Sequence, residues 1–202
     1  MAEEGTARAG SGPPGLPIHV ESRRKKRGTV EKAWPGALIL DVTSKGEAPW
    51  ARFSPFYPHG GIPVPNTPGT FALSVEGLWQ GLKVFEHEDV DASRWQIEDM
   101  RGIKRGGGKR GKVLGHRFGL GSGERLGYRD ARYNIYLPAY RWVLENRLVE
   151  EMGRLRAEVA ARAVVLLDYE TNGDVEDLSS PLSHAALVKL YLESRWPTTS
   201  EE

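Results

Sequence analysis

The residues best suited to chemistry in this sequence fall on one stripe of a predicted helix. Glu76, Gln80 and Lys83 are spaced i, i+4 and i+7, so a helix brings them to one face. Gly77 and Gly81 lie on another stripe, where glycine is costly unless a neighbouring segment approaches closely. We therefore expect a helix that is buried on most sides, with the stripe of Glu76, Gln80 and Lys83 lining a cavity.

A carboxylate fixed beside a cavity suits the cleavage of a glycosidic bond. The transition state of that reaction resembles an oxocarbenium ion, and Glu76 would stabilise its positive charge. A second polar group from Asp168, Asn172 or Asp174 would face Glu76 and orient or deprotonate the attacking water. The predicted catalytic residues are Glu76, Lys83 and Asp174. The alternative is that Glu76 is structural, as a first-turn carboxylate that favours the helix dipole or pairs with Lys83.

An aromatic loop stiffened by proline is predicted between Trp50 and Gly69. Loops of this length are uncommon in a compact domain unless they bind something. The alternative is that the aromatic rings cover the core. A ring that stacks on a nucleobase contributes about 1–3 kcal/mol to binding. The candidate stacking residues are Phe53, Phe56, Tyr57 and Trp79.

Charge changes sign in the middle of the chain. Residues 86–99 carry six Asp or Glu against one Arg, and residues 101–132 carry ten Lys or Arg against two Asp or Glu. The basic part is rich in glycine, and free backbone N–H groups with nearby cations suit phosphate. Its spacing matches neither the P-loop nor the dinucleotide fingerprint, and a solvated loop is the alternative. Further candidate substrate-binding residues are Arg101, His116, Arg117 and Asn172.

Other chemistries find little support in the sequence. The chain has no cysteine, which excludes a thiolate metal site and a cysteine nucleophile. Its five histidines form no close metal-binding pair. Ser54 and Ser74 lack the sequence context of a nucleophile elbow. We therefore predict no metal and no cofactor.

These residues have to be positioned by an α+β fold, which we expect to be one compact, mostly helical domain with a small sheet. Short apolar runs at residues 37–42 and 163–169 predict buried strands. The clearest helix is predicted from Ser74, its N-cap, to Glu86. Helical patterns also cover residues 129–161.

Two prolines mark helix starts in the second half of the sequence. Pro138 forces a break or a new first turn within the helical stretch. Ser180 and Pro181 predict the start of a last helix that runs to about Ser194, with Ser180 as its N-cap.

Composition sets the expected domain boundaries. Residues 1–36 are predicted to be a flexible Gly/Pro-rich tail with a basic run at Arg23–Arg27, residues 37–196 the folded domain, and residues 197–202 a disordered C-terminus. The basic run is either solvated or a contact for a polyanion. No apolar run approaches the roughly 18 residues of a membrane span. The absence of cysteine favours a cytoplasmic location.

Two segments of the sequence resemble the NADAR superfamily. Residues 52–57 (RFSPFY) are similar to its F-S-N-F segment, and residues 74–85 (SVEGLWQGLKVF) are similar to its helix of the form S-E-H-x-x-Q-x-x-K-F. Looser matches extend the similarity to about residues 52–195. The sequence departs from the family pattern at Pro55, at the inserted Val75, and in lacking the G-x-N-x-L-G signature before the last helix.

The superfamily includes N-glycosidases of riboflavin-pathway intermediates and hydrolases that remove ADP-ribose from guanine bases. The resemblance implies a NADAR-like domain in which Glu76 is the catalytic glutamate and Gln80 and Lys83 match helix positions of the family. It also implies that the segment Phe53–Tyr57, including Ser54, forms part of a base pocket.

Our leading hypothesis is a NADAR-like N-glycosidase that acts on a nucleotide or an ADP-ribosylated nucleobase. Lys83 and a residue of the basic loop would hold phosphate, and water would be the nucleophile. The alternative is a catalytically inactive relative that binds a nucleotide or serves in interaction or assembly. A plain nucleic-acid-binding module ranks third, because the net charge is only +1 and the basic segment lacks interleaved aromatic residues. An open pocket that Glu76 shares with an aromatic residue and an arginine would favour the enzyme.

Overall fold

The structure is a computed structural model that describes residues 17–121 and 123–199. This part of the chain combines helices with three small sheets, which confirms the predicted α+β class. Among the described residues, no helix is long and apolar enough to cross a membrane.

One end of the molecule is a parallel sheet built around a buried central strand. Its order is β1 (Ile18–Ser22), β8 (Val164–Asp168) and β2 (Leu38–Asp41). The first three residues of β8 are fully buried, as expected for the central strand of a parallel sheet. The strands predicted at residues 37–42 and 163–169 are therefore confirmed.

The prediction of a flexible tail over residues 1–36 is wrong for residues 18–36. Ile18 is 1% exposed and lies opposite Val164 in the pairing of β1 with β8. The next element, α1 (Arg27–Ala33), buries Val30. Composition did not reveal this strand because its partner comes near the other end of the chain. Residues 1–16 of the expected tail lie outside the described part. At the C-terminus, residues 197–199 have no regular structure and residues 200–202 lie outside it.

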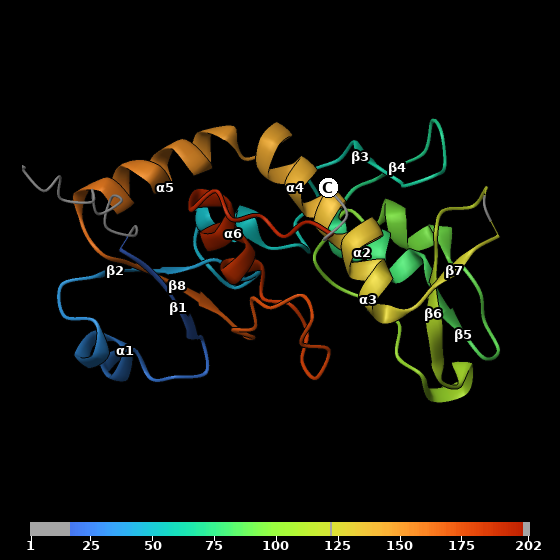
Figure 1. Ribbon diagram of the computed structural model, residues 1–202, viewed down its shortest axis with the longest axis horizontal. Coiled ribbons are helices and arrows are strands. Elements are labelled where there is room, and N and C mark those ends of the chain that lie inside the picture. Colours follow the sequence, from blue (N-terminus) through green and yellow to red (C-terminus); the bar gives the residue numbers. More distant parts are fainter. Residues whose placement is uncertain (1–16, 122, 200–202) are drawn as a thin grey trace, which may run out of the picture.

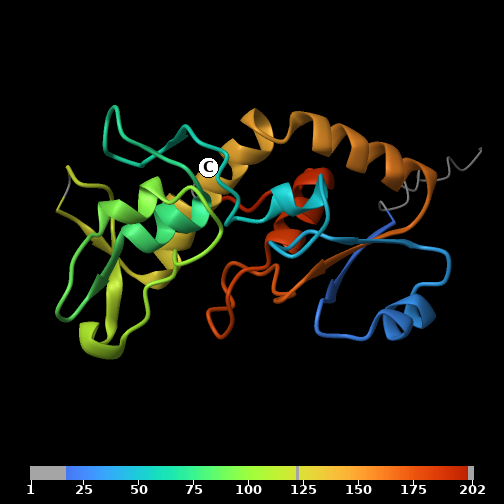
Figure 2. The same ribbon diagram turned by 180° about the vertical axis from the view of Figure 1, so that it is seen from behind.

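The other end of the molecule is an antiparallel sheet of order β5 (Lys83–Phe85), β6 (Val113–Arg117) and β7 (Arg125–Leu126). Figures 1 and 2 show this sheet and the parallel sheet at opposite ends of the long axis. A short hairpin of β3 (Ile62–Pro63) and β4 (Phe71–Ala72) lies at the same end as the antiparallel sheet.

Helices connect the two ends. α4 (Leu137–Asn146) and α5 (Val149–Ala161) follow one another along one side of the molecule (Figure 1). α4 continues a helical stretch that begins with α3 (Tyr128–Ala131) and passes through a π-helical segment, Arg132–Tyr136. Pro138 lies in the first turn of α4, as predicted. The helical pattern over residues 129–161 is therefore confirmed.

The last helix exists but begins later than predicted. α6 (His184–Leu192) is capped by Ser183, whose hydroxyl accepts a hydrogen bond from the N–H of Ala186 at 3.1 Å. The prediction that Ser180 is the N-cap is wrong, because the Ser180 carbonyl accepts a hydrogen bond from the Arg132 guanidinium at 2.6 Å and so belongs to the preceding loop.

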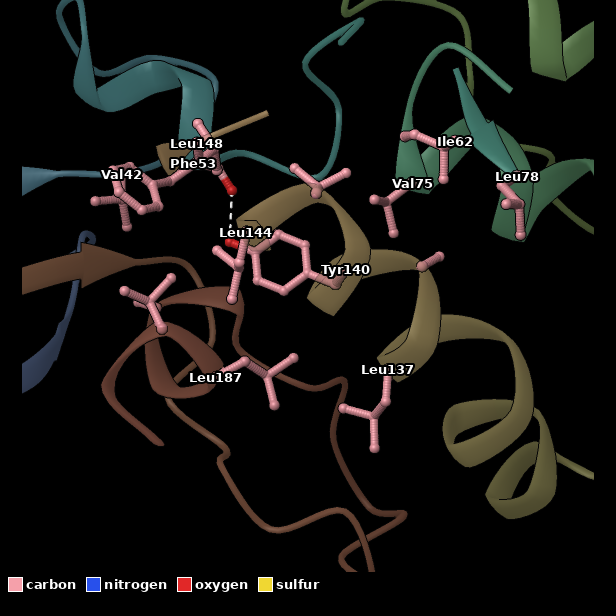
Figure 3. Packing of buried hydrophobic residues seen from close by; sticks show 14 of the residues in the cluster. Val42, Phe53, Ile62, Val75, Leu78, Leu137, Tyr140, Leu144, Leu148 and Leu187 are labelled. Carbon is pink, nitrogen blue, oxygen red and sulfur yellow. Dashed lines mark hydrogen bonds between the residues drawn. The ribbon is translucent and has the colours of Figure 1, made fainter. Parts of the chain in front are cut away.

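The core is continuous between the two ends and is centred on α4 (Figure 3). Tyr140 is fully buried, and its hydroxyl donates a hydrogen bond to the Phe53 carbonyl oxygen at 2.7 Å. Val42 and Leu187 approach this helix from the parallel sheet and α6, while Leu78 approaches from the opposite end. Because one core spans both ends, the two sheets belong to one folded unit.

The helix that carries the candidate residues is shorter than predicted. α2 (Val75–Gly81) has the predicted N-cap, since the Ser74 hydroxyl accepts a hydrogen bond from the N–H of Gly77 at 3.0 Å. The extension to Glu86 is wrong, because Lys83–Phe85 form β5. The physical reason is the pairing of β5 with β6, which takes the backbone groups that a longer helix would use.

Both glycines of α2 are required by close neighbours, as expected. A Cβ atom on Gly81 would lie 2.0 Å from Nε1 of Trp95, and one on Gly77 would lie 2.6 Å from the carbonyl oxygen of Arg94. The segment that holds Arg94 and Trp95 therefore packs directly on the helix backbone. This contact buries the glycine stripe of α2, which is separate from its polar stripe.

Candidate functional site

A cavity of about 700 Å³ is lined by α2, by the antiparallel sheet and by the helical stretch from α3 to Tyr136. This volume suits a small-molecule ligand. Glu76, Gln80 and Lys83 all line the cavity, as expected from their stripe. Lys83 does so from β5 rather than from the helix, because α2 ends before it.

Glu76 is buried in the wall of the cavity. Glu76 is 8% exposed, and its Oε1 accepts a hydrogen bond from Nε2 of Gln80 at 2.9 Å. Burial raises the pKa of the Glu76 carboxyl, against the opposing effects of the Gln80 hydrogen bond, Lys104 and Lys83. It is the only carboxylate among the described residues that line the cavity.

Two lysines place positive charge in the cavity beside Glu76. Lys83 and Lys104 both line it, and neither ammonium group has a carboxylate within ion-pair distance among the described residues. Burial lowers the pKa of Lys83, and the charges of Arg105 and Lys104 lower it further, while Glu76 acts the other way. The cavity therefore offers unpaired cations to an anionic ligand.

His116 and Trp79 form a tilted pair of rings in the wall of the cavity. His116 lies opposite Lys83 in the β5–β6 register, and its ring centroid is 3.8 Å from that of Trp79. Burial and the charges of Lys83 and Arg105 lower the pKa of His116 to about 3, so the imidazole is neutral. Both ring nitrogens are buried without a hydrogen-bond partner among the described residues.

Sequence reasoning missed the wall that comes from the helical stretch. Tyr128, Arg132 and Tyr136 all line the cavity. Their i, i+4 and i+8 spacing places them on one helical face, which is the signal that would have found them. Tyr136 lies edge-on to Trp79 with 5.7 Å between ring centroids, and burial raises the Tyr136 pKa well above its ordinary value. Arg105 and the apolar residues Val113, Leu114, Pro181 and Leu182 were missed as well.

The segment Phe53–Tyr57 does not line the cavity. Phe53 belongs to the core, and Ser54 is 2% exposed with its hydroxyl accepting from the N–H of Phe56. Tyr57 packs against His59 instead. These residues therefore do not form part of this cavity, and their contact with a substrate stays a prediction. The segment still supports the site, because the carbonyl oxygen of Pro55 accepts a hydrogen bond from the N–H of Glu76 at 2.8 Å.

Phe56 does not line the cavity but contacts a residue that does. Its ring centroid is 5.4 Å from the ammonium group of Lys104, which lines the cavity. A cation over a ring face is held by the ring quadrupole. Phe56 therefore positions a cation of the site rather than lining it.

Asp174 and Asn172 are placed outside the cavity lining. Asp174 is exposed and accepts a hydrogen bond from the N–H of Glu176 at 2.9 Å, and Asn172 donates to the carbonyl oxygens of Asp177 and Ser180. Both side chains shape the loop before α6. The prediction that Asp174 faces Glu76 is wrong, because the side chains of Asn172 and Asp174 form hydrogen bonds that build turns within the acidic loop.

Asp168 is likewise occupied elsewhere. Its Oδ2 lies 2.9 Å from Nδ1 of His184 and accepts a hydrogen bond from the Ser183 hydroxyl at 2.8 Å. These contacts join the end of β8 to the start of α6. Asp168 is therefore a structural residue.

Arg117 and Arg101 also lie outside the cavity lining. Arg117 forms a two-pronged ion pair with Asp89, at 3.1 and 2.7 Å. Arg101 is exposed, and its backbone N–H donates to Asp99. Neither residue lines the cavity, and the Arg117 guanidinium is neutralised by Asp89 of the acidic segment at residues 86–99.

The basic run at Arg23–Arg27 is largely paired with acids. Arg23 lies 2.7 Å from Asp41, and Arg27 lies 2.8 Å from Glu31. Arg24 pairs with Glu170 and Lys25 with Glu21. These pairs reduce the positive charge that the run presents to a polyanion.

The described residues contain no group of three or more His, Asp or Glu side chains that could hold a metal ion.

Comparison with known protein families shows a match over most of the chain. Residues 22–188 match a family described as "Family of unknown function (DUF6939)", a span that includes every residue lining the cavity. No curated protein and no solved structure matches the chain.

Proposed function

This chain belongs to the DUF6939 family, and we propose that it is an N-glycosidase that hydrolyses the N-glycosidic bond of a ribosylated base. The substrate is a nucleotide or an ADP-ribosylated nucleobase, and the enzyme is a divergent relative of the NADAR superfamily. One observation carries the proposal. A buried carboxylate, Glu76, shares a cavity with two unpaired lysines and a cluster of aromatic rings.

The carboxylate supplies the electrostatic part of the reaction. Departure of the base leaves positive charge on C1 and the ring oxygen of the ribose, and the Glu76 carboxylate stabilises it in a site of low dielectric. Water then forms a bond to C1 and loses a proton to the departed base or to solvent, so the products are the free base and a sugar with a C1 hydroxyl. Because the catalytic form is the ionised carboxylate, activity falls as the pH decreases through the raised pKa of Glu76.

The cations and rings supply binding. Lys83 and Lys104 would hold a phosphate group, and this is supported by the lack of acidic partners for their ammonium groups among the described residues. The rings of Trp79, Tyr128 and Tyr136 offer flat apolar surfaces to a base. These interactions would fix the sugar beside Glu76 and so place C1 near the carboxylate.

A catalytically inactive nucleotide-binding protein is the second candidate. The observation that favours it is the lack of a second carboxylate among the described residues of the cavity lining. Without one, activation of the attacking water falls to a weaker group. The cations and rings would still bind a nucleotide in such a protein.

A cytoplasmic location and contact of the Arg23–Arg27 run with a polyanion remain parts of the proposal. The absence of cysteine supports the first. The ion pairs of the run weaken the second, so we expect the cavity rather than this run to make the main contact with an anionic substrate.

The test is base release by the wild-type protein and by Glu76→Gln. The substrates are ADP-ribosylated guanine in DNA, NAD, ADP-ribose and ribosylated pyrimidine intermediates of riboflavin synthesis. We expect release from one of them, reduced by about 100-fold or more in Glu76→Gln. Glu145→Gln makes the same chemical change on an exposed face of α4 and should retain full activity.

The outcomes separate the two candidates. Release that Glu76→Gln retains would exclude Glu76 as the catalytic carboxylate. Nucleotide binding without any release would favour the inactive binding protein.

A further inference from the structure

We propose that Arg105, acting through Gln80, is a positioning residue that fixes the orientation of the Glu76 carboxylate. This inference rests on the proposed function only in calling Glu76 the reactive group. It assigns a role to a residue of the basic loop that does not itself need to touch the substrate.

Arg105 is buried against the junction between α2 and β5. Its side chain is 0% exposed, and the residue as a whole is 4% exposed. The guanidinium donates hydrogen bonds to the carbonyl oxygens of Gln80 at 3.0 Å and Lys83 at 2.8 Å, and to Glu88 at 2.8 Å. A guanidinium that donates to this many acceptors fixes the loop around Arg105 against the C-terminal end of α2. Its neighbours Lys104 and Gly106 then line the cavity.

The backbone of the same residue sets the direction of the Gln80 amide. The N–H of Arg105 donates to Oε1 of Gln80 at 3.0 Å. A backbone N–H can only donate, so the oxygen of the amide must face it and the NH₂ group must face the other way. That group donates to Oε1 of Glu76 at 2.9 Å. The orientation of the Gln80 amide is therefore fixed by Arg105 at its oxygen and by Glu76 at its nitrogen.

This chain of hydrogen bonds has a chemical consequence. A Gln80 that can only donate to Glu76 stabilises the ionised carboxylate over the protonated acid. Among the described residues Oε2 of Glu76 has no hydrogen-bond partner, so it is the oxygen available to a ligand. Gln80 is thus a positioning residue, in place of the substrate contact that its sequence position suggested.

Other groups also face Glu76 and set the background for a test. Lys83 from β5 and Lys104 from the basic loop favour the carboxylate. Tyr136 from the π-helical segment stays protonated, and His116 from β6 is neutral. The charge of Arg105 lowers the pKa of Lys83, whereas the pKa of the Glu76 carboxyl is set by burial, Gln80, Lys104 and Lys83. We therefore expect the main effect of the Arg105 side chain on Glu76 to pass through Gln80.

The experiment is a pH titration of the Glu76 carboxyl carbon by NMR in the full chain. Gln80→Met removes both hydrogen bonds of the amide. Gln80→Glu keeps an acceptor for the Arg105 N–H but replaces the donor to Glu76 with a second carboxylate. We expect the Glu76 titration midpoint to rise by about one to two pH units in Gln80→Met. Gln80→Glu should raise it further, because two adjacent carboxylates cannot both ionise easily.

A double-mutant cycle tests the role of Arg105. Arg105→Met should raise the Glu76 midpoint in the wild-type background and have no further effect in Gln80→Met, because the connection is already broken. Arg110→Ala is the matched control. Arg110 lies in the same loop and pairs with the same Glu88 at 2.6 Å, but it has no contact with Gln80 among the described residues. It should leave the midpoint unchanged.

Two results would overturn the inference. One is an unchanged Glu76 midpoint in both Gln80 variants, and the other is an equal shift by Arg105→Met in both backgrounds. Each is independent of catalysis. Midpoint shifts without base release from any substrate would leave the positioning role intact and reject the glycosidase. Base release that depends on Glu76, together with unchanged Glu76 midpoints, would support the glycosidase and reject the positioning role of Arg105.

Discussion

Glu76 is the residue at which function and stability oppose each other most directly. The carboxyl is buried, and burial is the largest influence on its pKa, which is raised. Gln80, Lys83 and Lys104 offset only part of that cost. A stable fold has no need of an ionisable group here, because a neutral amide would fill the same space.

We therefore predict that Glu76→Gln increases stability while it removes activity. A carboxyl group with a higher pKa in the folded chain binds more protons when folded, so its contribution to stability declines as the pH rises above about 4.5. Replacing it should add on the order of 1 kcal/mol at pH 8, or about 2–4 °C in melting temperature for a chain of this size. The gain should vanish near pH 4, where both chains are neutral at this position.

Thermal melts at pH 4, 6 and 8 measure this effect, with Glu145→Gln as the surface control. The control should change the melting temperature little, and equally at each pH. A loss of stability in Glu76→Gln at pH 8 would mean that the carboxylate is a favourable structural pair, which is the structural alternative considered for this residue.

The residue types at the site could be anticipated only where the local pattern was sufficient. Helical spacing puts Glu76 and Gln80 on one face of α2, whereas Lys83 reaches the same cavity from β5. Asp174 was placed wrongly, because its backbone N–H and its carboxylate are bonded to Asn172 and Glu176 in local turns. Side chains that reach the site from distant elements depend on packing, which spacing along the chain does not encode.

At the scale of elements, the junction between β8 and α6 is held by a buried ion pair. Nδ1 of His184 faces the Asp168 carboxylate, and Nε2 lies 2.8 Å from the carbonyl oxygen of Val42. Both partners are acceptors, so both ring nitrogens carry protons and the imidazole is charged. Asp168 and the hydrogen bond to Val42 raise the pKa of His184 despite its burial, and His184 lowers the pKa of Asp168 despite its burial.

We predict that His184→Gln destabilises the protein in a pH-dependent way. The His184 contribution is fully present below the unfolded pKa of 6.5 and is lost as the pH rises through the higher folded value. The Asp168 contribution is present above 3.8 and is lost as the pH falls through its lower folded value. Breaking the pair should cost about 3 kcal/mol near pH 5, and the difference from wild type should shrink at pH 9.

Chemical denaturation at pH 5 and pH 9 measures the difference. Ser183→Ala is the matched control, because it removes the α6 N-cap and a hydrogen bond to Asp168 without removing a charge that titrates in this range. Its cost should be similar at both pH values. An equal cost for His184→Gln at pH 5 and pH 9 would show that the imidazole is neutral in the folded protein.

For the elements that were predicted, the ends were harder to place than their existence. Apolar runs identified β2 and β8, and periodicity identified α2 and the later helices, whereas α1 and the other strands were not predicted. The end of α2 at Gly81 and the start of α6 at His184 depend instead on partners far along the chain: β6 pairs with the residues that follow α2, and Arg132 binds the carbonyl oxygen of Ser180. A helix boundary set by a distant partner leaves no local signal.

At the scale of the whole molecule, the first described strand pairs with a strand from the last quarter of the chain. β1 pairs with β8 in parallel, so residues near the two ends of the chain share one sheet. Ile18 belongs to the same hydrophobic cluster as Leu78 of α2, at the opposite end of the molecule. The core that supports the site therefore includes residues that composition alone assigns to a tail.

We predict that Ile18→Asp abolishes cooperative unfolding or lowers the melting temperature steeply, whereas Lys26→Asp has little effect. Ile18 is 1% exposed, so an aspartate there would place an unpaired charge in the core. Lys26 is an exposed neighbour on the same segment and lies at the N-cap of α1, where aspartate is favoured. Circular dichroism melts of the two variants measure the contrast.

If residues 18–36 were a flexible tail, both substitutions would be tolerated equally. A large loss for Ile18→Asp alone, accompanied by weaker nucleotide binding in the cavity, would show that one cooperative core connects the β1 strand to the site.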